Sequence, residues 1–257
     1  MIDLSFDEGI AILRIERGPV NALDAELLAG IAGALDEIEA ASARAAVVTG
    51  SGAAFSAGAD LIRLLDEGAA YVEAARPYAS LVFRRMFLMP IPMIAAINGH
   101  AIAGGFVLAL ACDHRVSAAG NHRIGLPELR VGVPFPMWAL EIVRFTVSPP
   151  HLQRMLYSGR LADPDEAMTM GLIDDVVAPE ALMEAALRAA RRLAAIPPAT
   201  FALTKSALRE PFAERARGGE ARDEEGMRIW ASEEARAAVQ RFIERTLGGG
   251  RTERPDA

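Results

Sequence analysis

The sequence is poor in cysteine and lysine: Cys112 is its only cysteine, and Lys205 is the only lysine among 27 lysine and arginine residues. A single cysteine excludes a disulfide framework, and a lone thiol in an apolar stretch is more often a small core residue than a nucleophile. The net charge of -7 leaves no general basic surface for a polyanion. We therefore expect neither redox chemistry nor a nucleic-acid partner.

Apolar runs long enough to span a membrane are also missing. Charges, glycines or prolines interrupt each run before it reaches the ~18 residues that a membrane-spanning helix needs. The N-terminal segment MIDLSFDEG is acidic, whereas a signal peptide begins with basic residues. We expect a cytoplasmic protein without a membrane partner.

Several catalytic signatures are absent as well. His100, His114, His122 and His151 have no metal-ligand spacing, so no metal site is predicted. There is no G-x-S-x-G elbow and no Walker loop. The turn at residues 50–55 follows a predicted strand, as a dinucleotide-binding turn does, but phenylalanine replaces its third glycine and no helix begins there. Hydrolase, NTPase and dinucleotide-binding functions are therefore disfavoured.

What the sequence does contain is a central stretch, residues 93–113, that predicts a buried strand followed by a buried helix. Residues 93–97 have no polar side chain, as expected of a strand covered on both faces. Residues 106–112 contain good helix formers and no polar face. The pair Gly104-Gly105 therefore lies at a helix start, where unpaired N–H groups and the positive end of the helix dipole favour an anion.

A second helix start follows another buried strand, residues 45–49. Asp60 begins this helix, so the N–H of Ala59 also lies near a helix N-terminus. Two such N–H groups aimed at one point form an oxyanion hole. Each one alone is equally consistent with an ordinary turn between a strand and a helix.

The rest of the chain alternates strands and helices, which indicates an α/β protein with a helical C-terminal region. We predict a hairpin over residues 2–15, and Pro197-Pro198 marks the start of the C-terminal region. Further helices are predicted at residues 24–41, 62–65, 71–88, 151–157, 163–170, 179–195, 199–208 and 223–247, and further strands at 113–118 and 173–177.

Glu128 is the candidate for proton transfer. It follows Pro127 at the start of a predicted helical turn, where the dipole favours a surface glutamate. Alternatively, apolar neighbours raise its pKa toward the working range of a general base. The local sequence leaves both interpretations open.

Five segments, in order and in register, resemble the enoyl-CoA hydratase/isomerase (crotonase) superfamily over nearly the whole chain. The resemblance implies a spiral of repeated strand-strand-helix units and assembly as a homotrimer or a dimer of trimers. It also implies an acyl-CoA substrate whose thioester carbonyl is held by the N–H groups of Ala59 and Gly104. The segments are Pro19–Leu23, Phe55–Leu61, Ile97–Gly99 with Ala103–Gly105, Ala111–Asp113 and Gly125–Glu128.

Within that superfamily the chain departs from the hydratases, which resemble one another in carrying two glutamates. Val107 occupies the position of the first, so only Glu128 remains. Residues 129–138 are similar to mitochondrial-type 3,2-trans-enoyl-CoA isomerases. The resemblance thus implies an isomerase that moves a β,γ double bond into conjugation with the thioester, as in fatty acid β-oxidation. The alternatives are a hydratase, another crotonase-type reaction or a non-catalytic acyl-CoA-binding paralogue.

The resemblance also suggests how the chain is divided. Residues 1–196 are expected to form the spiral core with the acyl-CoA site, and residues 197–257 a helical oligomerisation region with a disordered tail from about 248. No cofactor is expected beyond the CoA of the substrate, and residues 61–88 are expected to form the pocket wall. An apolar face that includes Met227 and Trp230 is assigned to core or subunit interface. Residues expected to contact substrate or CoA are Ala57, Asp60, Leu61 and Arg245.

Overall fold

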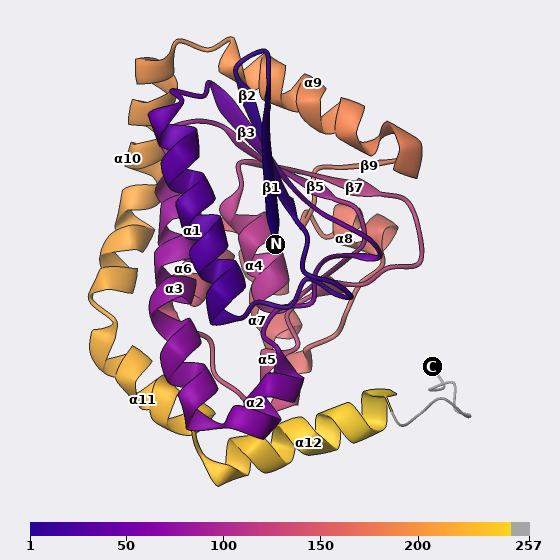
Figure 1. Ribbon diagram of the computed structural model, residues 1–257, viewed down its shortest axis with the longest axis vertical. Helices are drawn as coiled ribbons and strands as arrows, with labels where there is room; N and C mark the ends of the chain where they lie inside the picture. Colours follow the sequence, from indigo (N-terminus) through magenta and orange to yellow (C-terminus); the bar gives the residue numbers. More distant parts are fainter. Residues whose placement is uncertain (248–257) are drawn as a thin grey trace.

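Two sheets organise the chain in the computed structural model, which describes residues 1–247 (Figure 1). The larger has the order β1-β2-β3-β5-β7-β9, and the smaller has the order β4-β6-β8. The β1–β2 hairpin is antiparallel and all other pairs are parallel. The strands are β1 (Ile2–Asp7), β2 (Ile10–Ile15), β3 (Ala45–Gly50), β4 (Ala54–Ser56), β5 (Met93–Ile97), β6 (His100–Ile102), β7 (His114–Ala118), β8 (Ile124–Gly125) and β9 (Asp175–Val177).

Helices cover both faces of the larger sheet, because its strands alternate apolar side chains between two cores. In β3, Val47 packs toward α9, whereas Val48 packs into the main core with α1, α3 and α4. The helices are α1 (Ala25–Ala40), α2 (Leu61–Glu67), α3 (Ala69–Leu88), α4 (Gly104–Ala111), α5 (Glu128–Val131), α6 (Met137–Thr146), α7 (Pro149–Ser158), α8 (Pro164–Thr169), α9 (Leu182–Ala194), α10 (Pro198–Arg217), α11 (Glu220–Trp230) and α12 (Glu233–Leu247), with a 3-10 turn η1 (Pro179–Ala181).

The chain repeats one unit three times. In each unit a strand of the larger sheet is followed by a strand of the smaller sheet and then by a helix: β3-β4-α2, β5-β6-α4 and β7-β8-α5. The helix starts therefore follow three hydrogen-bonded neighbours, β4, β6 and β8. The predicted α/β class and the spiral of strand-strand-helix units are confirmed.

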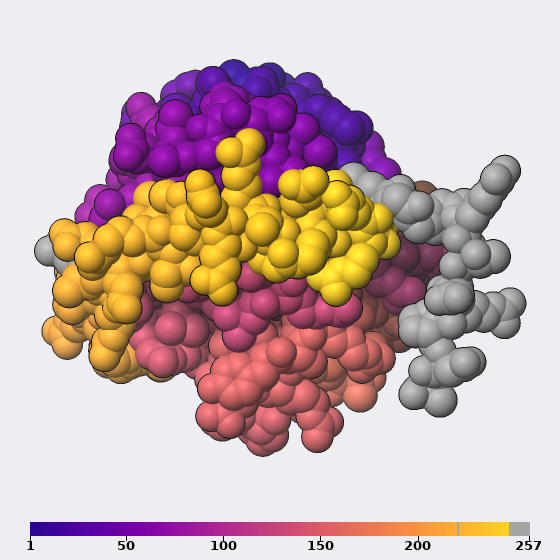
Figure 2. Space-filling view, turned by 90° about the horizontal axis from the view of Figure 1, so that it is seen from below, coloured from indigo at the N-terminus to yellow at the C-terminus, as the bar shows by residue number. Residues whose placement is uncertain are grey.

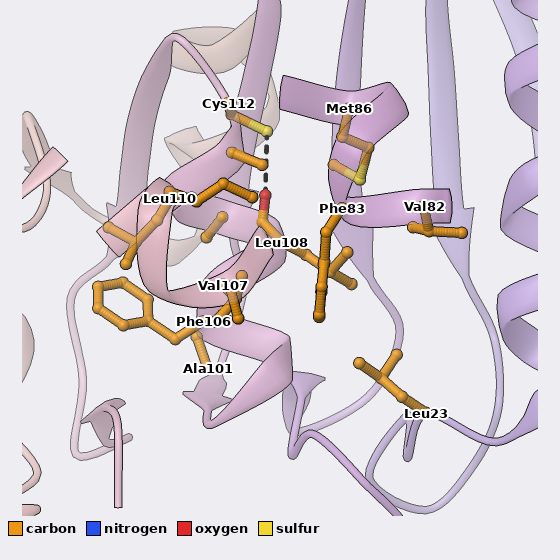
Figure 3. Packing of buried hydrophobic residues seen from close by; sticks show 14 of the residues in the cluster. Leu23, Val82, Phe83, Met86, Ala101, Phe106, Val107, Leu108, Leu110 and Cys112 are labelled. Carbon is orange, nitrogen blue, oxygen red and sulfur yellow. Dashed lines mark hydrogen bonds between the residues drawn. The ribbon is translucent and has the colours of Figure 1, made fainter. Parts of the chain in front are cut away.

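The central helix α4 is buried all round, as its sequence predicts. Figure 3 shows its side chains packed with Phe83 and Met86 of α3 and with Leu23, which precedes α1. Cys112 is a buried core residue; its thiol donates to the carbonyl oxygen of Leu108 at 3.5 Å. Burial raises the pKa of this thiol to about 12, which makes it unreactive.

Two predictions for the C-terminal helices are wrong. The helix predicted to end at Leu208 continues to Arg217 through Pro211. Buried Arg209 anchors it, since its guanidinium donates to the carbonyl oxygen of Ala111 at 3.0 Å and to Asp113 at 2.7 Å. The single helix predicted over residues 223–247 is instead α11 and α12. They are separated at Ser232, whose hydroxyl accepts a hydrogen bond from the first turn of α12.

The last helix, α12, crosses the molecule and packs against α2 and α5, as the view from below shows (Figure 2). Its contact with α5 is close: a Cβ added to Gly132, which ends α5 in the left-handed conformation, would lie 2.5 Å from the Cβ of Ala238. None of the described helices combines the length and the apolar character needed to cross a membrane. The predicted disordered tail lies outside the described residues.

Candidate functional site

A cavity of about 140 Å³ lies where the three helix starts meet. Ala59, Gly104 and Glu128, which follow β4, β6 and β8, all line it. Parallel strands direct their carboxyl ends to one edge of a sheet, and ligands of α/β proteins bind at such edges. The other lining residues are mostly apolar: Leu23, Leu28, Tyr71, Val72, Ala75, Arg76, Ala79, Ser80, Phe83, Ala103, Val107, Pro134, Phe135, Pro136, Ala139, Asp223, Gly226, Met227 and Trp230.

Gly104 begins α4, and its N–H has no acceptor within the described part of the chain. Ala103, just before it, has a φ of +52°, a conformation that is rare outside glycine and concentrates at functional sites. The loop after β4 lies against this turn: a Cβ added to Gly58 would lie 3.0 Å from the Gly104 nitrogen. The two helix starts are therefore in direct backbone contact.

The segment before α1 holds the loop that carries Ala59. The Leu23 N–H donates to the carbonyl oxygen of Gly58 at 2.8 Å. Buried Asn21 donates to the carbonyl oxygen of Ala54 at 2.8 Å, and its own carbonyl oxygen accepts from the Ser56 hydroxyl at 2.7 Å. Two of the recognised segments, residues 19–23 and 55–61, are thus hydrogen-bonded to each other. Among residues 1–247, no group accepts the N–H of Ala59.

Glu128 is buried, with 6% of its surface exposed, and its Oε2 has no hydrogen-bond partner among the described residues. Burial raises the pKa of this carboxyl to about 8, and a hydrogen bond from its own backbone N–H opposes the shift only in part. A buried, unpartnered carboxyl is costly to maintain. Its pKa lies in the range in which a carboxylate works as a general base near neutral pH.

The cavity has a second carboxyl that the sequence did not reveal, that of Asp223 on α11. Its Oδ1 accepts from the Met137 N–H at 2.7 Å, at the start of α6. Burial raises the pKa of Asp223, and the charge of Arg76 acts in the opposite direction. Val107, by contrast, is buried and gives the wall beside Gly104 an apolar side chain (Figure 3).

The four residues assigned to substrate or CoA contact lie outside the cavity wall. Ala57 lies between β4 and α2, and its N–H donates to the carbonyl oxygen of Val20 at 3.0 Å. Asp60 caps α2, because its carboxylate accepts a hydrogen bond from the backbone N–H of Arg63 at 3.0 Å. Half-buried Leu61 is the first residue of that helix. Arg245 is exposed on α12, with its Nε bonded to the carbonyl oxygen of Arg241. Their contact with CoA stays a prediction.

Two walls of the cavity come from helices. The wall predicted within residues 61–88 is formed by α3, through Tyr71, Phe83 and their neighbours. Met227 and Trp230, assigned from sequence to core or subunit interface, pack against the main core and also line the cavity. The Trp230 Nε1–H donates to the carbonyl oxygen of Pro134 at 2.9 Å. The site therefore draws on both the spiral and the C-terminal helices.

Together these groups can stabilise a developing oxyanion and move a proton. Two unpartnered N–H groups at adjacent helix starts are suited to a carbonyl oxygen that gains negative charge. A buried carboxylate at the third helix start can accept a proton from a neighbouring carbon. This is the chemistry of an enolate-forming enzyme.

The chain belongs to the enoyl-CoA hydratase/isomerase family, whose model matches residues 5–247. It is an enzyme of this family, which acts on acyl-CoA substrates. It is 31% identical to human enoyl-CoA delta isomerase 1, mitochondrial, over 80% of this chain and 70% of that protein. It is also 33% identical to the probable enoyl-CoA hydratase EchA17 of Mycobacterium bovis, over 82% of this chain and 80% of that protein.

A solved structure resembles the fold over almost its whole length. The crystal structure of human mitochondrial delta3-delta2-enoyl-CoA isomerase superposes with a TM-score of 0.91, at 28% identity, covering 97% of this chain and 99% of that one. The family and the fold predicted from sequence are thus confirmed. The relatives carry both isomerase and hydratase names, so the reaction must be argued from the site itself.

Proposed function

We propose that this enzyme is an enoyl-CoA isomerase that moves a β,γ double bond of an acyl-CoA thioester to the α,β position. Glu128 removes a proton from the α-carbon, and the electrons pass into the thioester as a dienolate. The N–H groups of Ala59 and Gly104 stabilise its oxygen, each worth about 3 kcal/mol by analogy with acyl-transfer enzymes. Glu128 then returns the proton to the γ-carbon, which leaves the double bond conjugated with the thioester.

The observation that carries the proposal is the environment of Glu128. Its carboxyl lies in a mostly apolar cavity, and no group of residues 1–247 makes a hydrogen bond to its Oε2. Addition of water requires groups that hold and orient the water as well as a base. Val107 cannot do so, because its side chain neither donates nor accepts a hydrogen bond. A proton shuttle needs one carboxylate, and Glu128 supplies it.

Asp223 supports a second candidate, a hydratase. It is the other carboxyl of the cavity, and it approaches from α11 rather than from the position of Val107. Together, Glu128 and Asp223 offer the two acid-base groups that hydration uses. The Met137 N–H already occupies Oδ1 of Asp223, which favours a structural cap on α6 and ranks this candidate second.

Two parallel assays test the proposal. Purified enzyme is given a 3-enoyl-CoA, and formation of the conjugated thioester is followed by absorbance. It is then given a 2-enoyl-CoA, and loss of that absorbance reports hydration. Isomerisation with little hydration supports the proposal. Fast hydration that is lost in Asp223→Asn would establish the hydratase instead, and acyl-CoA binding without either reaction would indicate a non-catalytic paralogue.

The adjacent glycines at the start of α4 offer a matched pair of substitutions. A Cβ on Gly104 would lie 3.2 Å from Leu23 Cδ1 and 3.6 Å from Phe83 Cζ, two side chains that line the cavity, and its nearest backbone neighbour would be Gly58 Cα at 3.9 Å. A Cβ on Gly105 would lie 2.2 Å from the carbonyl oxygen of Ser56. We expect Gly104→Val to lower kcat/KM about 10²-fold by displacing the thioester from its donors. We expect Gly105→Ala to cost about 2–3 kcal/mol of stability through overpacking.

Urea unfolding and isomerase kinetics of both variants check this expectation. The two effects should separate, with activity lost in the first variant and stability lost in the second. A Gly104→Val enzyme with wild-type kcat/KM would show that the thioester does not lie against α4.

The pH profile follows from the pKa of Glu128. A general base acts in its ionised form, so kcat/KM should rise about tenfold per pH unit below pH 8 and level off above it. The profile should be measured from pH 6 to 9.5. Binding of a saturated acyl-CoA, measured at the same pH values, is the control for substrate affinity. A profile that is flat across this range would contradict a Glu128 base with this pKa.

A further inference from the structure

The hydroxyl of Tyr71 lies between two backbone groups next to the proposed oxyanion donor. It accepts a hydrogen bond from the N–H of Asp60 at 2.8 Å and donates to the carbonyl oxygen of Leu23 at 2.8 Å. Tyr71 is on the first turn of α3, is 4% exposed, and lines the cavity. One side chain therefore joins α3, the segment before α1 and the start of α2.

The backbone geometry explains why this position matters. Leu23 and Ala59 form an isolated parallel bridge. The Leu23 N–H binds the carbonyl oxygen of Gly58. In the trans peptide between Gly58 and Ala59, the C=O and N–H bonds point in opposite directions. The Ala59 N–H is thus directed away from Leu23, and any rotation of this peptide changes where it points.

In a regular parallel ladder, the next bond would run directly from the Asp60 N–H to the carbonyl oxygen of Leu23. The Tyr71 hydroxyl is inserted at this point and makes a bond to each group. The hydroxyl thus connects the two segments on the C-terminal side of Ala59, while the Leu23 N–H connects them on the N-terminal side. The orientation of the peptide that carries the Ala59 N–H depends on both.

We propose that Tyr71 is a positioning residue that sets the direction of the Ala59 N–H toward the thioester oxygen. The proposal rests on the proposed role of that N–H. Tyr71 acts through the backbone and not by proton transfer, because its only hydroxyl proton is donated to Leu23. Burial raises the pKa of this phenol, with Asp60 and Asp24 acting in the same direction and the Asp60 N–H and Arg63 opposing.

Tyr71→Phe should remove both bonds and leave the ring in the cavity wall. Leu23 and Asp60 then either lose their partners or approach each other, and in both cases the peptide before Ala59 shifts. Misplacement of a catalytic group by about 1 Å can cost 10²-fold in rate. We expect kcat to fall about 10- to 100-fold while KM changes less than about threefold, since the apolar wall is intact.

The decisive readout is the thioester carbonyl itself. A saturated acyl-CoA carrying ¹³C at the carbonyl has no double bond to move, so it reports hydrogen bonding without turnover. Difference infrared spectra of the bound ligand should show a lowered carbonyl stretching frequency in the wild type and a smaller lowering in Tyr71→Phe. Tyr78→Phe is the matched control, because Tyr78 lies on the same helix and is 40% exposed; it should match the wild type in frequency and kcat.

The outcomes separate the two proposals. If the carbonyl stretching frequency in Tyr71→Phe equals that in the wild type, the positioning role is overturned, whatever the kcat. An unchanged kcat in Tyr71→Phe also overturns it. If Tyr71→Phe does not yield folded protein, Tyr71→Leu also lacks the hydroxyl and should show the same smaller lowering. A wild-type enzyme that lowers the frequency but does not isomerise would refute the isomerase function and leave the positioning role supported by the spectra. No lowering in the wild type refutes both.

Discussion

Replacement of Glu128 by glutamine is expected to lower kcat for 3-enoyl-CoA isomerisation by about 10²–10⁴-fold. The amide has nearly the shape of the carboxyl but cannot take a proton from carbon. The cavity wall and the N–H groups of Ala59 and Gly104 are unchanged, so KM should change little. Steady-state kinetics at pH 8.5, where the wild-type carboxyl is largely ionised, gives the largest contrast.

Glu37→Gln is the matched control, because Glu37 is exposed on α1 and does not line the cavity. It should retain wild-type kinetics. Calorimetric binding of a saturated acyl-CoA should be preserved in Glu128→Gln, which separates loss of the base from loss of the site. Substantial isomerisation by Glu128→Gln would eliminate Glu128 as the proton shuttle and direct attention to Asp223.

The same substitution is expected to stabilise the protein at alkaline pH. The pKa of Glu128 is raised from 4.5 to about 8 on folding. Below pH 4.5 this carboxyl is protonated in both the folded and the unfolded protein, whereas between pH 4.5 and 8 it is protonated only in the folded protein. Stability therefore falls as pH rises through this window, by about 1.4 kcal/mol per unit and roughly 5 kcal/mol in total. Glutamine does not titrate, so Glu128→Gln should escape this loss.

The free energy of unfolding is measured with urea at pH 6 and pH 8.5, both above the sequence pI of 5.3. These two values span about half of the pH range over which stability is expected to fall. The stability difference between Glu128→Gln and wild type should grow by roughly 2–3 kcal/mol from the lower to the higher pH. Glu37→Gln should show no such change. Parallel pH dependences of Glu128→Gln and wild type would mean that the carboxyl is not desolvated in the native state.

Much of the candidate site could be predicted from sequence because its signals are local. Gly104 and Asp60 are residue types typical of helix starts, and both lie at helix starts in the structure. The five segments that resemble the family then identified Glu128 as belonging to the same site. The strands β4, β6 and β8, however, have only two or three residues, too few to show a periodic pattern. The small sheet that brings the helix starts together was therefore not predicted.

The missed residues depend on packing between distant segments. Asp223 was not singled out at all, Tyr71 was predicted only as part of the pocket wall, and Trp230 only as part of an apolar face. The pattern of a helix alone does not say which neighbour such a residue faces. The continuation of α10 past Pro211 depends on Arg209, whose partners lie about 100 residues earlier in the sequence. The break before α12 did have a local signal, since Ser232 followed by two glutamates is a typical helix start.

The order of the small sheet has a consequence for selectivity. Neighbouring strands lie about 4.8 Å apart, so the order of this sheet sets the spacing between the proposed N–H donors, which follow β4 and β6, and the proposed base, which follows β8. That spacing determines which carbons, counted from the carbonyl, the base can reach. The helices α3 and α11 supply much of the remaining cavity wall. We therefore expect the position of the reacting double bond and the tolerated length of the acyl chain to be set by separate parts of the molecule, which can change independently of each other.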